Sequence, residues 1–309
     1  MNGTGSYPIV HAQIEPTTQC NFRCPKCTNR DVPAGRRGHL TPDNLKLMLD
    51  RMPFVRDVSF CGLGETFMNP RIMSLFEETR SRGIVQRVTT NASLLHEFDA
   101  DEILRLMEKI HVSFDAATAE TFERVRRGAS FERVVENVKN LARVKRENAR
   151  PTIISMNCVV TRDNVHEMEA VPALAKDLGF DRVSFVSAVQ LVGVGGKNSR
   201  IENLRLNDPG AERDLARALE RLCAENGLGF SFADSRPRLP GCWWPRGGVY
   251  VTFDGWFTPC CLRMDPTEYT LGNILEKPFE ELYNGGAWRA FRESFSTGNY
   301  AQTCINCPG

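Results

Sequence analysis

The chain has 309 residues, of which 41% are hydrophobic and 25% are charged, and its formal net charge is +1. This composition is typical of a globular protein large enough to bury a substantial core. A net charge so near zero argues against binding dominated by the phosphates of nucleic acid or by an anionic membrane surface. The sequence has neither an apolar stretch long enough to span a bilayer nor a secretory signal pattern at its amino terminus. We therefore expect a cytoplasmic protein without a nucleic-acid or membrane partner.

Short β-rich runs alternate with amphipathic helical patterns from residue 8 to about residue 190. Thr41 and Pro42 predict the beginning of one helix, as its N-cap and its first helical residue. Another helix is expected from Phe131, where apolar residues recur at helical spacing. The expected strands are 9–15, 55–61, 85–90, 110–115, 153–160 and 182–186. Six strands that alternate with helices indicate a parallel sheet of right-handed βαβ units.

The chain is too short for eight βα units followed by a cysteine-rich segment. We therefore predict an α/β fold with a partial (β/α)6 TIM barrel, open rather than closed, over residues 1–227. A small metal-stapled subdomain is expected over residues 228–309. A helix is expected over 208–226, ahead of that boundary. The glycine-rich segment 193–199 lacks the arrangement of a phosphate-binding loop, so we expect a flexible connection or lid that borders the active site.

The chain has 11 cysteines, which is many for a cytoplasmic protein, where disulfides are rare. Three of them stand alone, and we expect Cys61, Cys158 and Cys223 to be buried as small apolar residues. The other eight fall into two groups and need a metal, redox or catalytic explanation. The two groups are Cys20, Cys24 and Cys27, and Cys242, Cys260, Cys261, Cys304 and Cys307.

The first group has the spacing C-x3-C-x2-C and directly follows the first expected strand. Three soft thiolates suit an iron–sulfur cluster of four irons, in which one iron then has no protein ligand. A structural zinc site is the alternative, and it would recruit His11 or His39 as a fourth ligand. Zinc sites favour paired C-x2-C knuckles, so the spacing favours the cluster.

Together with segments at the ends of later strands, this motif resembles the signature of the radical SAM superfamily. The segment 61–65, Cys-Gly-Leu-Gly-Glu, is similar to the family's glycine-rich element, which contacts the amino group of S-adenosylmethionine. Glycines allow close approach of the backbone, and Glu65 supplies negative charge for an ammonium group. By the same resemblance, Arg127 would pair with the carboxylate of the cofactor. The residues that the resemblance assigns to S-adenosylmethionine are Gly62, Gly64, Glu65, Asn91, Ser113, Asp115, Arg127 and Asn157.

Two positions depart from the family pattern. The residue before the third cysteine is often aromatic in the family, but here it is Lys26. The Gly-Glu pair is often followed by proline, but here Thr66 follows. Neither position is a ligand, so the departures affect fine positioning and leave the resemblance intact.

The resemblance implies the chemistry of the family. The iron with an open position binds S-adenosylmethionine, the reduced cluster supplies one electron, and the resulting 5′-deoxyadenosyl radical abstracts a hydrogen atom from the substrate. The expected partners are a small-molecule substrate and a one-electron donor such as flavodoxin or ferredoxin. The barrel and the appended tail would exclude water from the radical.

The second cysteine group resembles the twitch subdomain, the shortened form of the SPASM extension of radical SAM enzymes. The resemblance implies one auxiliary [4Fe–4S] cluster held by four cysteines. A zinc-ribbon-like structural site is the alternative. Adjacent cysteines rarely both ligate one cluster; the spacing from Gly255 favours Cys260 over Cys261, but both stay open. The expected ligands are Cys242, Cys260, Cys304 and Cys307.

Full cysteine ligation would leave the auxiliary cluster without a vacant iron. Two reactions are then the main candidates for the activity. In the first, the substrate radical loses a proton to a base and an electron to the cluster, which oxidises an alcohol to a ketone. This resembles the twitch dehydrogenase of aminocyclitol antibiotic biosynthesis. In the second, a thiol returns a hydrogen atom to the opposite face, as in the twitch-bearing aminoglycoside epimerases. The candidate donors are Cys261 and Cys158, and Cys61 is weaker because it adjoins the cofactor motif.

Only 19 residues precede Cys20. Peptide-modifying relatives usually recognise a leader with a separate amino-terminal domain, for which this stretch leaves no room. We therefore expect a small polar substrate, such as a sugar or an aminocyclitol, and acidic residues at strand ends would suit an amine. Decarboxylation and peptide modification stay open as other reactions. A non-enzymatic zinc protein, with both cysteine groups structural, is the alternative of another class.

Overall fold

The computed structural model describes residues 10–188, 192–193, 196–197, 206, 208–234, 239, 241–300 and 304. Nine strands of this part form one sheet in the order β11-β10-β1-β2-β3-β4-β5-β6-β9. All neighbours in it are parallel except β10 and β11. The strands are β1 (His11–Ile14), β2 (Asp57–Phe60), β3 (Val85–Thr90), β4 (Lys109–Ser113), β5 (Ile153–Val160), β6 (Arg182–Ser187), β9 (Gly229–Ala233), β10 (Gly248–Val251) and β11 (Phe257–Thr258).

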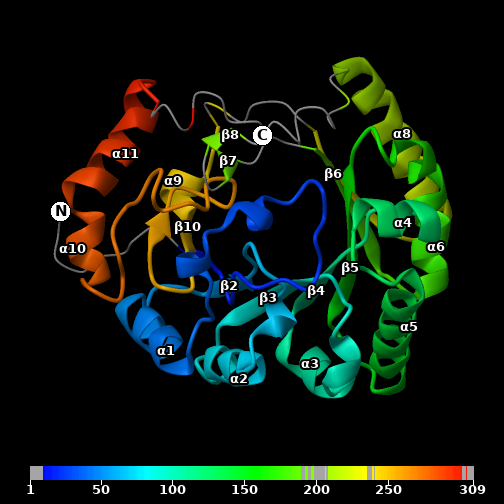
Figure 1. Ribbon diagram of the computed structural model, residues 1–309, viewed down its shortest axis with the longest axis horizontal. Helices are drawn as coiled ribbons and strands as arrows, with labels where there is room; N and C mark the ends of the chain where they lie inside the picture. Colours follow the sequence, from blue (N-terminus) through cyan, green and yellow to red (C-terminus); the bar gives the residue numbers. More distant parts are fainter. Residues whose placement is uncertain are drawn as a thin grey trace.

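Helices cover the outside of this curved sheet, and the loop that follows β1 lies within the curve (Figure 1). In the described part of the chain, five 3-10 helices stand between the longer elements; they are η1 (Thr28–Asp31), η2 (Ala34–Arg36), η3 (Thr66–Met68), η4 (Leu95–Glu97) and η5 (Val165–Ala170). The α-helices are α1 (Pro42–Arg51), α2 (Ile72–Ser81), α3 (Ala100–Leu106), α4 (Ala119–Val125), α5 (Phe131–Glu147), α6 (Val171–Leu178), α8 (Pro209–Glu225), α9 (Trp244–Gly247), α10 (Phe279–Tyr283) and α11 (Gly286–Thr297).

The two faces of the sheet differ because successive side chains of a strand point in opposite directions. On the helix-bearing face the side chains are buried and mostly apolar; Phe60, for example, lies 5.1 Å from Phe76 of α2 between ring centroids. On the opposite, concave face they are mostly polar and half-buried. This concave face includes Gln13, Ser59, Arg87, Thr89, Lys109, His111, Ser113, Asn157, Arg182 and Ser184.

The six strands expected from the sequence are confirmed, as is a barrel that stays open. The two edges were not foreseen: β9 pairs with β6, and β10 pairs with β1 on the other side. Because β9 continues the sheet past residue 227, hydrogen bonds cross the expected domain boundary, which stays a prediction. Within the segment 193–199, Gly193 and Gly196 pair in a two-stranded ladder of β7 (Val192–Gly193) and β8 (Gly196–Lys197), and the remaining residues lie outside the described part.

Local sequence signals fix where the expected helices begin. The Thr41 hydroxyl accepts a hydrogen bond from the Asn44 backbone N–H, and Pro42 is the first residue of α1. Asp208 caps α8 in the same way, by accepting from the N–H groups of Gly210 and Ala211. Each cap satisfies backbone donors that have no partner within the helix.

The carboxyl-terminal part packs on the first βα unit through polar and aromatic contacts. Arg51 donates to the carbonyl of Ile274 at 2.5 Å, and the Phe54 ring lies 4.6 Å from that of Phe279. Arg36, in the loop after β1, forms a 2.5 Å ion pair with the buried Asp265. Among the residues that the structure describes, none of the helices has the length and apolarity needed to cross a membrane.

Candidate active site

The loop after β1 gathers the first three cysteines, and we call residues 20–27 the first cysteine loop. The Cys27 N–H donates to the Cys24 carbonyl at 3.1 Å, which closes a turn between them. Backbone N–H groups also face the sulfurs: Phe22 donates to Cys20 Sγ at 3.5 Å and Asn29 to Cys27 Sγ at 3.4 Å. Such donors favour the thiolate, whereas burial raises the pKa of Cys20 to about 12.

The loop after β2 packs on residues 17–19, which lead directly into the first cysteine loop. The Gly64 N–H donates to the Thr17 carbonyl at 3.1 Å, and the Glu65 N–H donates to the Gln19 carbonyl at 2.8 Å. A Cβ on Gly64 would lie 2.4 Å from both of those carbonyl oxygens, so a larger residue cannot occupy this position without moving the backbone. The Asn29 side chain ties the same loops together by donating to the carbonyls of Thr18 (2.6 Å) and Leu63 (3.0 Å).

Glu65 is 3% exposed and holds the ends of β2 and β3 together. One oxygen accepts from the Thr90 hydroxyl at 2.6 Å, and the other accepts from the Asn91 N–H at 2.6 Å. Burial raises the pKa of Glu65. Thr66, where the family often has proline, donates its hydroxyl to the Thr89 carbonyl at 2.8 Å. The departure therefore adds a hydrogen bond that proline could not make.

Asp115, after β4, is fully buried between two cations. Its Oδ2 lies 2.5 Å from Lys26 Nζ and 2.7 Å from Arg126 Nη2, and its Oδ1 accepts from the Val159 N–H at 2.7 Å. Lys26, the other departure from the family pattern, thus anchors the first cysteine loop to β4. Although burial opposes it, the charges of Arg126 and Lys26 hold the pKa of Asp115 below its ordinary value. Arg127 is exposed, whereas its neighbour Arg126 is the arginine that points inward.

Most of the other residues expected to contact the cofactor also lie at the carboxyl ends of the strands, whereas Asn157 lies within β5. Asn91 donates through Nδ2 to Asn21 of the first cysteine loop at 3.0 Å. Gly62 lies against Glu15, whose Cγ would be 2.4 Å from a Cβ at that position. Ser113 and Asn157 are register partners on the concave face. The structure brings these positions to one end of the sheet, and their contacts with S-adenosylmethionine stay a prediction.

His111 is a polar residue of the concave face that the sequence analysis missed. It lies two residues before Ser113 on β4, and its Nδ1 is 3.1 Å from Asn157 Oδ1. Burial, followed by the charge of Lys109, lowers the pKa of His111 to about 4. The alternation of β4 could have revealed it, since residues two apart in a strand share a face.

The second cysteine group surrounds an apolar cavity, which we call the second cysteine pocket. Cys242, Cys260 and Cys304 all line it, and Cys307 lies outside the described part of the chain. Its other walls are formed by Leu239, Trp244, Pro245, Pro259, Arg263, Phe291 and Phe295. Cys261 does not line this cavity, and its charge contributes to raising the pKa of Tyr250 on β10, after burial and the charge of Glu15. The two adjacent cysteines therefore have different surroundings.

Two of the isolated cysteines are buried, as expected. Cys158 is fully buried on the helix-bearing face, where its Sγ lies 3.4 Å from Met168 Sδ, and burial raises its pKa strongly. Cys223 is buried in α8. Cys61 is only half-buried and lies at the end of β2. As a hydrogen donor Cys158 is therefore poorly placed, because it points away from the concave face.

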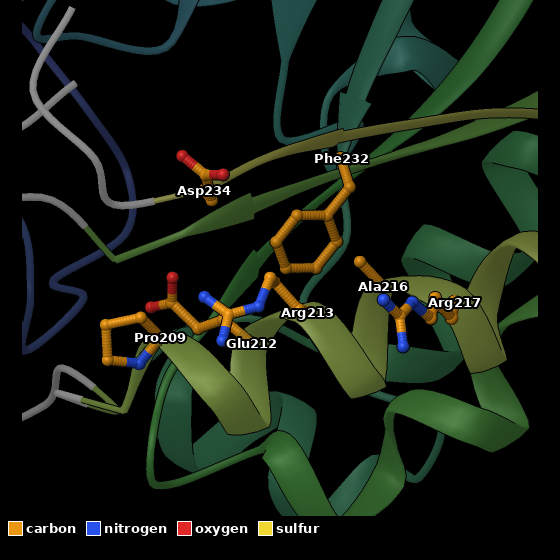
Figure 2. Close-up of a pocket in the computed structure, with 7 residues that line it drawn as sticks. All are labelled: Pro209, Glu212, Arg213, Ala216, Arg217, Phe232 and Asp234. Atoms are coloured by element: carbon orange, nitrogen blue, oxygen red, sulfur yellow. The ribbon is translucent and has the colours of Figure 1, made fainter.

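A further hollow lies between α8 and β9, and none of the residues that line it is a cysteine (Figure 2). Phe232 and Ala216 provide its apolar surface, and the charged side chains of Arg213 and Asp234 lie around it. Phe232 stacks near Phe185, with ring centroids 6.5 Å apart, so the hollow belongs to the helix-bearing side of the sheet. We assign no part of the reaction to it.

Both cysteine groups fit iron–sulfur clusters by the chemistry of their donors. The first cysteine loop offers three thiols with N–H donors and two nearby cations, and the second cysteine pocket offers thiols with apolar walls. Such surroundings are those that tune iron–sulfur centres. Within the described part of the chain, no three His, Cys, Asp or Glu side chains are grouped closely enough to hold a single metal ion.

Comparison with protein families agrees with this site. The Radical SAM superfamily matches residues 14–175, and an iron–sulfur cluster-binding domain named SPASM matches residues 242–308. The first match spans more than half of the chain, so the chain belongs to the radical SAM superfamily. Its carboxyl-terminal part is a SPASM domain. The cofactors are therefore S-adenosylmethionine and [4Fe–4S] clusters, and the zinc alternatives are set aside.

Individual relatives are distant. The chain is 23% identical to a tungsten-containing aldehyde ferredoxin oxidoreductase cofactor-modifying protein of Pyrococcus furiosus, over 97% of this chain and 87% of that protein. It is 26% identical to a PqqA peptide cyclase of Gluconobacter oxydans, over 90% and 77%. Among solved structures, SuiB of Streptococcus suis bound to precursor peptide SuiA covers 98% of this chain and 70% of its own, with a TM-score of 0.73 and 15% identity. This likeness shows the fold alone.

Proposed function

We propose that the protein is a radical SAM oxidoreductase that converts an alcohol of a small polar substrate into a ketone. The observation that carries this proposal is the half-buried imidazole of His111 on the concave face of β4, where its Nδ1 contacts Asn157 Oδ1. The substrate would be of the sugar or aminocyclitol class, and a flavodoxin or ferredoxin would supply electrons. The reaction requires the substrate to lose one hydrogen atom, one proton and one further electron.

His111 has the properties of the proton acceptor. With Nδ1–H donating to Asn157 Oδ1, the unprotonated Nε2 is left to accept a proton. Because burial lowers the pKa of His111 to about 4, the imidazole is neutral at pH 7. Asn157 fixes the ring orientation, and Ser155 donates to the same amide oxygen at 3.3 Å.

The remaining groups position and protect the reacting atoms. When bound, the cluster and S-adenosylmethionine supply a carbon radical that removes one hydrogen atom. The first cysteine loop would hold this cofactor pair, braced by Asn29 and Gly64. The last electron would pass to a [4Fe–4S] cluster held by Cys242, Cys260, Cys304 and Cys307. Apolar walls around that pocket keep water from the thiolates.

Anaerobic reconstitution followed by turnover with a substrate panel tests this proposal. In His111→Asn, cleavage of S-adenosylmethionine should persist while ketone formation falls by about 10²- to 10⁴-fold, the contribution of a general base. His166→Asn, at an exposed histidine 3.7 Å from Glu167, is the matched control and should behave as wild type. In wild type, kcat/KM should stay constant on lowering the pH until about pH 4, where His111 is protonated. Full ketone formation by the His111 variant would overturn the assignment.

Epimerisation is the second candidate, and the placement of Cys261 favours it. Cys261 lies outside the second cysteine pocket and near Tyr250, which is on the concave side of β10 as the register partner of Gln13. A thiol donor exchanges with solvent, so turnover in deuterium oxide would place deuterium at the product carbon. Loss of that deuterium in Cys261→Ala would identify the donor, whereas a carbonyl product indicates oxidation.

A peptide is the competing substrate class. One relative is named a peptide cyclase, and SuiB is bound to a precursor peptide. The substrate panel should therefore include ribosomal precursor peptides beside sugars and aminocyclitols. Modification of a peptide, detected as a mass change, with none of the small molecules consumed, would replace the small-substrate proposal.

A further inference from the structure

Three cationic side chains lie on the concave face of β3, β4 and β6, and β5 stands between the last two strands. Arg87 of β3 and Lys109 of β4 are register partners. Arg182 of β6 lies one two-residue step further along the sheet, level with His111, because both pair with Ser155 of β5. All three are half-buried rather than free in solvent. They lie near the amino-terminal ends of their strands, below the residues that face the first cysteine loop.

Their charge is poorly balanced. Asp57 pairs with Arg87 and also with His11, whose Nδ1 lies 2.6 Å from it. Within the described residues Lys109 has no hydrogen bond or ion pair. Arg182 donates through Nη2 to the Phe230 carbonyl at 3.3 Å, while its buried Nε has no partner there. Grouped cations with unused donors and one shared carboxylate carry an unfavourable self-energy that a bound anion would offset.

We propose that this cationic row, formed by Arg87, Lys109 and Arg182, binds an oxyanion group of the substrate, a carboxylate or a phosphate. Guanidinium forks and an ammonium group are the side chains that recognise such groups. The inference rests on the proposed function and narrows its substrate class to an anionic sugar derivative. The inference disfavours a polyamine as substrate. The acidic side chains at the strand ends that would bind an amine, Glu65 and Asp115, are already paired within the protein.

The distance from the row to the reaction is suitable for a small molecule. Along a strand two residues span about 6.6 Å, so Lys109 lies one such step below His111 and two steps below Ser113. An anion held at the row would place a carbon about four or five bonds away beside the His111 imidazole. The row therefore acts as an anchor that orients the alcohol.

The three cations of the row interact electrostatically across the strands, which supports treating them as one site. After burial, the charges of Arg182 and Arg87 lower the pKa of Lys109. The same two arginines and Lys109 contribute to the low pKa of His111. A bound anion would therefore change the pKa of both Lys109 and His111. The imidazole resonances of His111 report this change spectroscopically and do not depend on turnover.

The test titrates the reconstituted holoenzyme with inorganic phosphate and, separately, with acetate. Calorimetry and the imidazole resonances of His111 report binding. Wild type should bind one of the two saturably, and the preferred ion tells phosphate from carboxylate. Lys109→Gln/Arg182→Gln should weaken binding by about tenfold or more for the lost charged contacts. Lys139→Gln/Arg221→Gln removes the same charge from exposed positions on helices and should leave binding unchanged.

Two further outcomes separate this inference from the proposed oxidation. Lys109→Gln alone, at a side chain with no partner in the described structure, guards against misfolding of the double variant and should also weaken binding. Absence of saturable binding in wild type, or equal weakening in the control variant, would overturn the inference even if a neutral sugar is oxidised. Saturable binding that needs Lys109, together with no ketone from any substrate, would instead overturn the oxidation and leave the anion site in place.

Discussion

The first cysteine loop and the second cysteine pocket collect thiols in opposite surroundings. Around the first lie polar side chains that are buried and hydrogen-bonded, among them Asn29, Glu65 and Asp115. Around the second, the walls are tryptophan, phenylalanine, proline and leucine, with Arg263 as the charged member. S-adenosylmethionine is a charged cofactor, so the polar loop suits a site that must bind it. An apolar pocket suits a centre that only carries electrons.

Glu15, the residue after β1, links the two regions through its carboxylate. Its Oε1 accepts from the Leu63 N–H at 3.0 Å, beside the first site, and from the Tyr250 hydroxyl at 3.3 Å, from β10. Glu15 is 2% exposed, so this link is shielded from water. The contrast between the regions can therefore be tested at each side and at the link.

The largest effect is expected on catalysis and iron content, and it should distinguish the two cysteine groups. Cys27→Ala should abolish cleavage of S-adenosylmethionine, because the cluster loses one of three ligands. Cys260→Ala should retain that cleavage and lose product, with about four of about eight irons remaining. Cys261→Ala, at the adjacent thiol outside the pocket, should keep the full iron content. Iron analysis and the yield of 5′-deoxyadenosine measure these differences, and loss of iron in the Cys261 variant with none in the Cys260 variant would reverse the ligand assignment.

The next effect should appear in stability at the polar site. Asp115→Asn removes the charge between Lys26 and Arg126 and should lower the free energy of unfolding by about 3–5 kcal/mol, because two cations stay buried without a carboxylate. Denaturant unfolding measures it. The matched control is Asp50→Asn, at an exposed carboxylate paired with Lys46 and Arg82, where a much smaller change than at Asp115 is expected. Equal effects at both positions would contradict the special role of Asp115.

Glu15 should make stability depend on pH at the link between the regions. Burial raises the pKa of Glu15 to about 7 from its ordinary value of 4.5, so between these values the folded protein holds a proton that the unfolded chain releases. The free energy of unfolding should therefore fall by about 3 kcal/mol as the pH rises from about 4.5 to 7. Glu15→Gln should remove this slope, since a neutral amide can still accept from Leu63. A slope that survives in the variant would point to another group.

The smallest effect is expected in a comparison of stability between two variants, each of which loses one threonine hydroxyl. Thr66→Val removes the donor to the Thr89 carbonyl and should cost about 1 kcal/mol. Thr258 Oγ1 on β11 is buried and has no hydrogen-bond partner among the described residues, so Thr258→Val should be neutral or stabilising. Thermal unfolding of both variants measures the difference. A destabilised Thr258 variant beside an unchanged Thr66 variant would reverse the contrast between the regions.

Much of the fold could be predicted because its signals are local. Apolar alternation located the six central strands, and the caps Thr41 and Asp208 fixed helix starts. The edge strands β9 and β10 escaped because β10 pairs with β1, more than 200 residues away, and no local pattern specifies a distant partner. Lys26 departs from the family pattern, and its role was clear only once the structure showed its ion pair with Asp115.

By itself the sequence determined the chemistry that each cysteine group can support, since thiol number and spacing are covalent properties of the chain. It also determined the polar and apolar alternation of each strand. Only the tertiary structure decided which polar side chains meet, because register and sheet order bring together residues of strands far apart in sequence. That is why Arg126 rather than Arg127 turned out to face Asp115, and why the contact of His111 with Asn157 and the cationic row became visible only in the folded sheet.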